Sequence, residues 1–274
     1  PILHKGDIFI VISQSGETAD TLAALRLAKA AGLKVIAIRN CVGSTVSREA
    51  DEVIYTWAGP EIAVASTKAY TTQLMCLYLL ALKAGKMRET LSNEEYTKML
   101  AETEQIPCQV QQILDNKAII QKFASEQLNK SKIFYIGRQF DSATSLECAL
   151  KLKEVSYMHS EAFAAGELKH GPIALVDSNT LVVAIASMPE LYEKIGSNIV
   201  EVKTRGAATM VITQDNGDNF KGKADVVFSI PHVDETLASI LTIIPAQLFA
   251  YYCAVLRGND PDKPRNLAKS VTVE

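Results

Sequence analysis

An internal repeat constrains this chain more than any other feature. The segments "GDIFIVISQSGETADTLAALRLAKAAGLKVIAIRN", residues 6–40, and "NTLVVAIASMPELYEKIGSNIVEVKTRGAATMVITQD", residues 179–215, both run strand, turn, helix, glycine, strand. Each is followed by Ala-Asp-x-Val, and the two aspartates, Asp51 and Asp225, lie 174 positions apart (225 − 51). Such alternation forms a parallel sheet covered by helices, with ligands at the carboxyl ends of the strands. The sequence therefore predicts two copies of one α/β unit.

The second copy begins earlier than the first. A further strand, turn and helix, residues 132–159, precede its matching segment, and shifting them back by 174 positions lands before residue 1. We therefore expect that the first copy lacks its opening strand–turn–helix, and that residues upstream of Pro1 have been lost. The predicted organisation is a truncated first domain over 1–115, a second domain over 116–262 and a polar tail over 263–274.

The composition argues against several classes of function. A net charge of −3 provides no basic surface for nucleic acid. The five cysteines lie far apart, without C-x-x-C spacing or paired histidines, which is typical of reduced thiols and not of a zinc site. The chain contains no glycine-rich dinucleotide fingerprint and no P-loop. We expect a cytoplasmic protein with no cofactor, no metal and no nucleic-acid partner.

One apolar stretch, residues 236–258, is long enough to cross a membrane. Pro245 and Gln247 interrupt it, Asp234 and Glu235 precede it, and the chain offers no second candidate. We therefore expect no membrane span. The stretch predicts a helix or kinked helix pair buried at a domain or subunit interface.

The turn "SQSGETADT", residues 13–21, joins a predicted strand at Ile8–Ile12 to a predicted helix. The positions expected on the inner face of that helix are Leu22, Leu25, Leu27 and Ala28. Hydroxyl groups at a helix start either cap the helix, as Ser15 would with Glu17 or Thr18, or help hold an anion. The residues alone leave both interpretations open.

A second hydroxyl-rich turn, "GPEIAVASTKAYTTQ", covers residues 59–73 and would line the same edge of the sheet. Serine and threonine hydroxyls and backbone N–H groups are neutral donors, which suit a sugar phosphate without burying an unpaired charge. The two turns together predict a site for such a ligand.

Three charged residues, Glu147, Lys151 and Glu154, fall at i, i+4 and i+7 on one predicted helical face. They form either an exposed ion-pair ladder or an acid–base set. The following "AAGELKHGP" brings His170 into the same stretch, and these residue types can open a sugar ring and move a proton between adjacent carbons. Lys269, in the polar tail, is either a solvated lysine or part of the site.

Four motifs, "SQSGETADT", "VASTKAYTTQ", "ALKLKEVSYMHSEAFAAGELKHGP" and "PRNLAKSVTVE", resemble the isomerase domain of the glutamine–fructose-6-phosphate aminotransferases. The resemblance implies a pair of sugar isomerase (SIS) domains, with the tail contributing to the active site. It implies that the phosphate is bound by Ser13, Gln14, Ser15 and Thr18, with backbone contacts to the sugar from Val64 and Ala268.

The same resemblance implies four catalytic residues. Glu154 would move the proton between C1 and C2 of the sugar, with Lys151 assisting. His170 would help to open the ring and would reach the site from the neighbouring subunit of a homodimer. Lys269 would form a Schiff base with the C2 ketone of fructose 6-phosphate, from which ammonia releases it.

The implied product is glucosamine 6-phosphate, in the first step of hexosamine and UDP-GlcNAc synthesis. The family's glutaminase domain is absent from these 274 residues, so the ammonia source would be a partner domain. The alternatives are a non-catalytic regulatory SIS module that binds sugar phosphate, and a stand-alone SIS deaminase or isomerase. The presence of Glu154, His170 and Lys269 argues against the first, and the ending "NLAKSVTVE" argues against the second.

Overall fold

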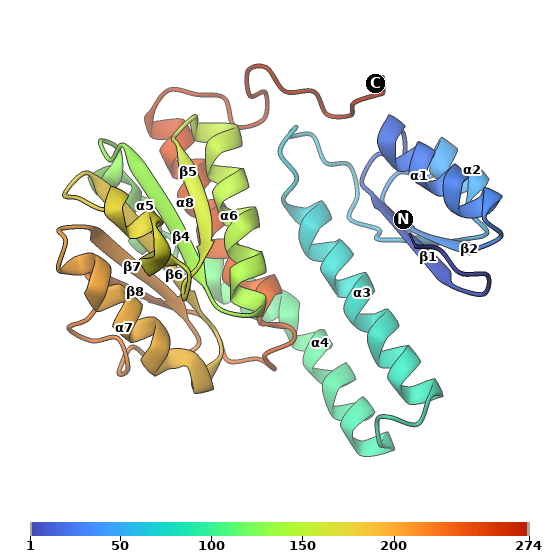
Figure 1. Cartoon of the computed structure of the whole chain (residues 1–274), viewed down its shortest axis with the longest axis horizontal. Coiled ribbons are helices and arrows are strands. Elements are labelled where there is room, and N and C mark those ends of the chain that lie inside the picture. Colours follow the sequence, from blue (N-terminus) through green and yellow to red (C-terminus); the bar gives the residue numbers. More distant parts are fainter. Residues whose placement is uncertain (1, 273–274) are drawn as a thin grey trace. The chain divides into compact units, whose positions relative to one another are not determined.

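The computed structural model describes residues 2–272, which form two compact units (Figure 1). Unit 1 contains the residues up to Met87 together with the tail, residues 265–272, and unit 2 runs from Arg88 to Pro264. The predicted boundary between residues 115 and 116 divides the two sequence repeats and not these compact units, so it stays a prediction.

Unit 1 is built on a three-stranded parallel sheet of order β1-β2-β3. Its elements are β1 (Ile8–Ser13), α1 (Ala19–Ala30), β2 (Lys34–Arg39), α2 (Thr45–Glu49), β3 (Glu52–Tyr55) and α3 (Lys68–Met87). The register pairs Ile8 with Lys34 and Ile36 with Glu52, so the three strands end at one edge. That edge carries the first hydroxyl-rich turn.

The core of unit 1 lies between the sheet and α1. Leu22, Leu25 and Ala28 are buried there, as predicted. Leu27 was expected on the same face but is 52% exposed. A helix turns by about 100° per residue, which places Leu27 roughly 200° from Leu25 and on the solvent side.

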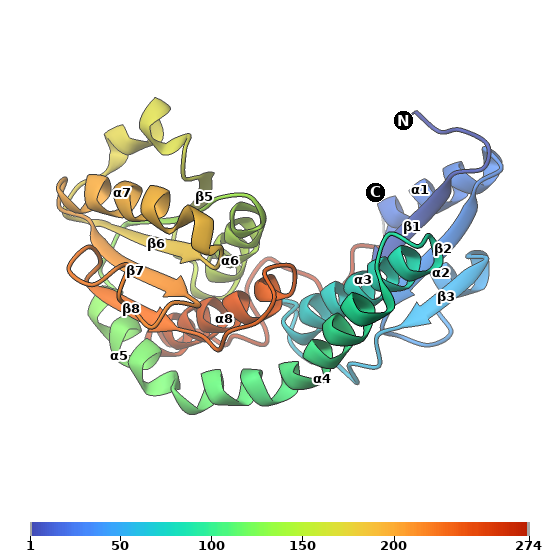
Figure 2. The ribbon, with the colours of Figure 1, turned by 90° about the horizontal axis from the view of Figure 1, so that it is seen from below.

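Unit 2 contains a five-stranded parallel sheet of order β5-β4-β6-β7-β8. Its elements are α4 (Asn93–Asp115), α5 (Lys117–Gln127), β4 (Lys132–Gly137), α6 (Phe140–Ser156), β5 (Ser160–Ala164), η1 (Leu168–His170), η2 (Pro172–Leu175), β6 (Thr180–Ala186), η3 (Pro189–Leu191), α7 (Tyr192–Lys203), β7 (Ala208–Thr213), β8 (Val226–Ser229) and α8 (Ala238–Leu256). Every residue of the central strand β6 is buried. Helix α7 covers one face of the sheet and α8 the other (Figure 2).

The apolar stretch predicted at 236–258 forms α8, a single helix with Pro245 inside it. By length and composition alone, α8 is the only helix within residues 2–272 that could cross a membrane. Most of its residues are buried inside unit 2, where it packs against α5 and α6. Its apolar character therefore belongs to the core of unit 2. Of the two predicted forms, a helix or a kinked helix pair, the structure shows the single helix, which continues through Pro245.

The repeat is confirmed by hydrogen bonds as well as by strand order. The Asp51 carboxylate accepts a 2.8 Å bond from the backbone N–H of Val35. The Asp225 carboxylate accepts a bond of the same length from the backbone N–H of Thr209. Each carboxylate also pairs with a lysine of the helix between the strands: Lys29 at 2.9 Å and Lys203 at 2.7 Å. All three positions recur after 174 residues, so both copies tie helix and strands together in one way.

Candidate functional site

The first turn (residues 13–18) is held by its own hydroxyl groups. The Ser13 Oγ accepts a 2.9 Å hydrogen bond from the backbone N–H of Gly16, and the Ser15 Oγ accepts one of 3.2 Å from that of Glu17. Thr18 is the N-cap residue of α1, but its side chain makes no capping hydrogen bond. The hydroxyls therefore shape the turn and do not form a capping box.

Gly16 allows this turn to lie directly on the residues beneath it. Its φ of +71° is in the left-handed region that favours glycine. A Cβ atom there would lie 2.1 Å from the Ser44 Oγ and 2.8 Å from the Arg39 Nη1. The turn backbone thus rests on a buried hydroxyl and a buried guanidinium.

Arg39 ends β2 and is fully buried. Its Nη2 donates a long hydrogen bond, 3.4 Å, to the Ser15 carbonyl, and its guanidinium carbon lies 5.9 Å from the centre of the Tyr55 ring. Burial lowers the pKa of Arg39, while Tyr55 and Glu17 act in the opposite direction. The guanidinium stays charged, because arginine does not lose its proton in proteins. Sequence reasoning missed Arg39. The one feature that could have indicated it is a single charged residue at the end of an apolar strand.

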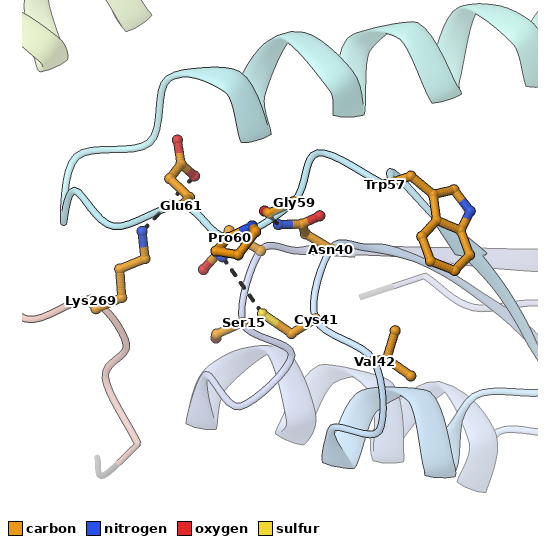
Figure 3. Close-up of a pocket in the computed structure, with 10 residues that line it drawn as sticks. Ser15, Asn40, Cys41, Val42, Trp57, Gly59, Pro60, Glu61 and Lys269 are labelled. Atoms are coloured by element: carbon orange, nitrogen blue, oxygen red, sulfur yellow. Dashed lines mark hydrogen bonds and ion pairs between the residues drawn. The ribbon is translucent and has the colours of Figure 1, made fainter.

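A cleft of about 540 Å³ opens at the carboxyl edge of this sheet (Figure 3). It is lined by the first turn, the loops that follow β2 and β3, and the tail: Gln14, Ser15, Asn40, Cys41, Val42, Trp57, Gly59, Pro60, Glu61 and Lys269. The Gln14 amide donates to the Cys41 Sγ at 3.7 Å. The cleft lies where ligands bind in open parallel sheets.

The tail folds back onto the first turn within unit 1. The Ser270 Oγ lies 3.1 Å from the Ser15 Oγ, and the Val271 carbonyl accepts a 3.1 Å hydrogen bond from the N–H of Ala19, at the start of α1. The Lys269 Nζ donates to the Ala63 carbonyl at the end of the cleft opposite Trp57 (Figure 3). The predicted contact residues are neighbours of this hydrogen bond in the sequence: Val64 follows Ala63, and Ala268 precedes Lys269.

Glu61 is a buried carboxylate beside Lys269. Its Oε1 accepts a 2.7 Å hydrogen bond from the backbone N–H of Thr67. Its Oε2 has no hydrogen-bond partner among residues 2–272 and lies 4.0 Å from the Lys269 Nζ. The carboxylate therefore faces the lysine amine. Sequence reasoning missed Glu61, since a single acid among hydroxyls is also typical of a loop.

The predicted acid–base residues of unit 2 lie on one face of α6. The Lys151 Nζ is 2.6 Å from the Glu154 Oε2 and 3.4 Å from the Glu147 Oε1. Lys151 is only 4% exposed, so these residues do not form an exposed ladder. Burial raises the pKa of Glu147, against the attraction of Lys151. The arrangement is a close carboxylate–ammonium pair that can hold and transfer a proton.

His170 ends η1 and is exposed. Within the described residues, no hydrogen bond or ion pair joins its imidazole to Lys151 or Glu154. Lys269 belongs to unit 1 and Glu154 to unit 2, so their meeting in one site stays a prediction.

The sequence profile of the SIS domain matches residues 1–83 and 128–257. This match covers most of the chain and includes the first turn, α6 and η1. The chain belongs to the SIS domain family. Its two parallel sheets flanked by helices are the predicted pair of SIS copies.

The chain is 56% identical over 274 residues to a glutamine–fructose-6-phosphate aminotransferase of Caldanaerobacter subterraneus subsp. tengcongensis. The match covers 100% of this chain and 45% of that relative, so the chain spans less than half of the relative's length. The structure resembles the C-terminal domain of the corresponding enzyme from Francisella tularensis, with a TM-score of 0.91 and 37% identity over 96% of this chain and 75% of that one. It also resembles a glucosamine-6-phosphate deaminase from Thermotoga maritima, with a TM-score of 0.76 and 26% identity over 99% of this chain and 77% of that one.

The second SIS copy has a smaller cleft, about 280 Å³, after its own strands β6 and β7. It is lined by Pro189, Gln214, His232, Val233, Asp234, Glu235 and Thr236. The second turn (residues 187–190) corresponds to residues 13–16 of the first turn after the shift of 174 positions. Here the N–H and hydroxyl of Ser187 both donate to the buried Asp141 carboxylate, at 2.8 and 2.6 Å.

Proposed function

We propose that this chain is the isomerase half of an amidotransferase that converts fructose 6-phosphate and glutamine-derived ammonia into glucosamine 6-phosphate. The observation that carries the proposal is the position of Lys269. Its amine lies at the cleft beside the first turn, next to a buried carboxylate, although the sequence places it in a polar tail. The identity to a named aminotransferase over the whole chain supports the same reaction.

In this proposal the first turn binds the phosphate. Ser13, Gln14, Ser15 and Thr18 supply neutral donors at the start of α1, where the helix dipole favours an anion. The backbone at Val64 and Ala268 contacts the sugar, because both residues adjoin the hydrogen bond that joins the tail to the loop before α3. The phosphate thus fixes the reacting end of the sugar toward Lys269.

The chemistry begins with the neutral Lys269 amine, which attacks the C2 ketone and releases water to form a Schiff base. Ammonia then adds to C2 and releases the lysine. Glu154 takes a proton from C1 and returns it to C2, while the C1 hydroxyl becomes the aldehyde of glucosamine 6-phosphate. Lys151, 2.6 Å from Glu154, holds that carboxylate in position, and His170 opens the sugar ring beforehand.

The proposal includes a glutaminase domain as the ammonia source and a homodimer in which His170 serves the neighbouring site. The exposure of His170 in this chain supports the second point. Tyr251, Val255 and Leu256 leave an exposed apolar end on α8 that could take part in the subunit contact. Sedimentation that finds only monomer at micromolar concentration would reject the homodimer. Five unpaired cysteines support a cytoplasmic location.

The test is borohydride reduction of the full-length enzyme with fructose 6-phosphate, followed by mass analysis of the C-terminal peptide. We expect a sugar adduct on Lys269 that disappears in Lys269→Ala and persists in Lys263→Ala. Lys263 is the matched control, because it is an exposed lysine a few residues away. Full turnover by Lys269→Ala would end the assignment.

The resemblance to a glucosamine-6-phosphate deaminase favours one second candidate, a stand-alone deaminase. The two reactions differ in their nitrogen balance. A deaminase releases ammonia from glucosamine 6-phosphate without glutamine, whereas an amidotransferase forms glucosamine 6-phosphate and glutamate from fructose 6-phosphate and glutamine. Ammonia release as the faster reaction would favour the deaminase, and binding without either reaction would favour a regulatory module.

A further inference from the structure

Arg39 is a buried cation without an ionic partner. Its side chain is 0% exposed, and neither Nε nor Nη1 has a hydrogen-bond partner among the described residues. No carboxylate within residues 2–272 lies within salt-bridge distance of it. A buried charge of this kind is destabilising by several kcal/mol unless it is paired. The folded chain therefore carries a positive charge whose counter-ion is not a side chain of the described protein.

The guanidinium lies on the inner side of the first turn. Its Nη2 contacts the Ser15 carbonyl, and its Nη1 lies 2.8 Å from the point that a Gly16 Cβ would occupy. The turn backbone thus separates Arg39 from the cleft that Ser15 lines. The Arg39 charge therefore acts on a ligand in the cleft electrostatically, through the low-dielectric turn and without direct contact.

The charged groups nearby do not neutralise Arg39. The Glu17 carboxylate is already engaged by the backbone N–H of Thr45, at 2.8 Å. Arg48 adds a second positive charge to the same surroundings. Tyr55 offers only its ring face, at 5.9 Å. The two arginine charges therefore exceed the single negative charge of Glu17 at the first turn.

We propose that Arg39 is the buried counter-charge for the phosphate dianion of the ligand held by the first turn. This inference deepens the proposed function and rests on it for the identity of the sugar phosphate. The four predicted phosphate-binding side chains, Ser13, Gln14, Ser15 and Thr18, are all neutral. Arg39 is thus the positioning residue that makes the cleft prefer a charged sugar to an uncharged one, through its field and its hold on the Ser15 carbonyl.

Removing the charge therefore has opposite effects on the empty and the occupied protein. In the empty protein, Arg39→Met removes an unpaired buried charge and leaves an apolar side chain of similar length, which is stabilising. In the occupied protein, the same change removes the attraction between the guanidinium and the dianion. A merely structural arginine would give the reverse pattern, with lower stability and unchanged affinity.

The experiment is calorimetric titration of the full-length protein with fructose 6-phosphate, together with the melting temperature of the ligand-free protein. We expect Arg39→Met to weaken binding by roughly tenfold or more, from a unit charge several ångströms away in a medium of intermediate dielectric constant. We expect its ligand-free melting temperature to rise. Arg39→Lys keeps the charge and is expected to retain most of the affinity.

Arg26→Met is the matched control. It removes one arginine charge from the same unit, but Arg26 lies exposed on α1 and pairs with Glu49 at 2.7 Å. We expect unchanged affinity and a slightly lower melting temperature. If Arg39→Met does not fold, Arg39→Gln takes its place with the same expected loss of affinity, and recovery by Arg39→Lys then replaces the stability readout.

Affinity within twofold of wild type in the uncharged variant overturns the inference, as does a lower melting temperature of the folded Arg39→Met variant. Titration with inorganic phosphate separates this failure from failure of the proposed function. If wild type binds phosphate but not fructose 6-phosphate, the proposed function fails, and the loss of phosphate binding in Arg39→Met still supports the role of Arg39. If wild type binds neither, both fail.

Discussion

The two SIS copies place turns of the same kind at the same point of their sheets, but the buried charge beside each turn has opposite sign. The first turn rests on Arg39, which reaches the Ser15 carbonyl. The second turn lies against Asp141, whose carboxylate accepts hydrogen bonds from both the N–H and the hydroxyl of Ser187. Ser13 and Ser187 occupy equivalent positions 174 residues apart, but the backbone after them differs: Gly16 has a φ of +71°, whereas Glu190 lies in the short helix η3.

This contrast supports the proposal that the anion site lies in the first copy. In the second copy, the protein's own carboxylate occupies the donors that an anion would need, and Glu190 stands where the first copy has Gly16. Burial raises the pKa of Asp141, and the Glu190 charge raises it further, while the hydrogen bonds from Ser187 lower it. In the second turn the donors of Ser187 are thus bonded to the Asp141 carboxylate. The first turn instead lies over the Arg39 cation and borders the larger cleft.

The largest expected effect comes from closing the first turn. Gly16→Ala places a methyl group against Ser44 and Arg39 and forces a non-glycine residue to a φ of +71°. We expect fructose 6-phosphate to bind about 100-fold more weakly, since strain of this kind costs about 1–3 kcal/mol and the donors move with the turn. Calorimetric titration measures the loss.

The control for this prediction is the equivalent change in the second turn. Glu190→Ala alters an exposed side chain at the corresponding position and is expected to leave the affinity within twofold. Near-wild-type binding by Gly16→Ala, in a protein with an unchanged circular dichroism spectrum, would show that the first turn does not hold the phosphate.

The second expected effect tests the tail, which lines the first cleft through Lys269. Glu61→Gln removes the carboxylate that faces Lys269 at 4.0 Å. We expect the rate of glucosamine 6-phosphate formation to fall by about 10- to 100-fold, because the amine is then less well positioned and loses a group that can accept its proton. Steady-state kinetics of the full-length enzyme measure it.

Thr67→Ala provides a graded comparison for Glu61→Gln. It removes a 3.2 Å hydroxyl contact to the Glu61 Oε1 but leaves the backbone hydrogen bond and the negative charge. We expect a loss of less than about tenfold, because one hydrogen bond to a charged group is worth about 1.5 kcal/mol and the Glu61 carboxylate stays in place. Equal losses in both variants would mean that Glu61 serves only to shape the loop.

The third expected effect concerns the stability of the second turn. The pKa of Asp141 is raised in the folded protein, so its protonated form is favoured by folding. That contribution is fully present below about pH 4 and is lost as the pH rises through the folded-state pKa. The stability of wild type relative to Asp141→Asn should therefore fall between pH 4 and pH 7. Urea unfolding at several pH values checks this, and a constant difference would contradict it.

The smallest expected effect is ligand protection of Cys41, which lines the first cleft and is exposed. Saturating fructose 6-phosphate should slow its alkylation by iodoacetamide several-fold, because the ligand would cover the thiol. Cys108 is exposed outside both clefts and is the internal control. Equal rates at Cys41 with and without ligand would place the ligand elsewhere.

The sequence alone predicted the parts of the molecule that depend on local pattern. The repeat, the first turn and the helical face of Lys151 and Glu154 all follow from spacing along one element. The charge pair on α6 could be located in this way, but its burial could not, since burial depends on packing against distant residues. The prediction for Leu27 was wrong for a related reason. Four apolar residues between positions 22 and 28 were placed on one face, although Leu27 lies about 200° around the helix from Leu25.

Arg39 and Glu61 show why the rest of the site stayed hidden. Each is a single charged residue in an otherwise ordinary strand or loop, and each acquires its role from a neighbour that is distant in sequence. Arg39 meets Ser15 across 24 positions, and Glu61 meets Lys269 across 208 positions (39 − 15 and 269 − 61). The periodicity of a sequence cannot predict such contacts, because the two residues of each pair come together only in the folded chain.

The return of the tail to unit 1 also sets the order in which the molecule can be completed during synthesis. The N–H of Ala19 is bonded to the carbonyl of Val271, and the 177 residues of unit 2 (264 − 88 + 1) are translated between the two parts of unit 1. At about 5–20 residues per second, the 252 residues after Ala19 up to Val271 (271 − 19) take roughly 13–50 s to translate, and the first turn lacks its tail during this time. Within these 274 residues, the cleft of unit 1 can therefore be completed only after unit 2 has been translated.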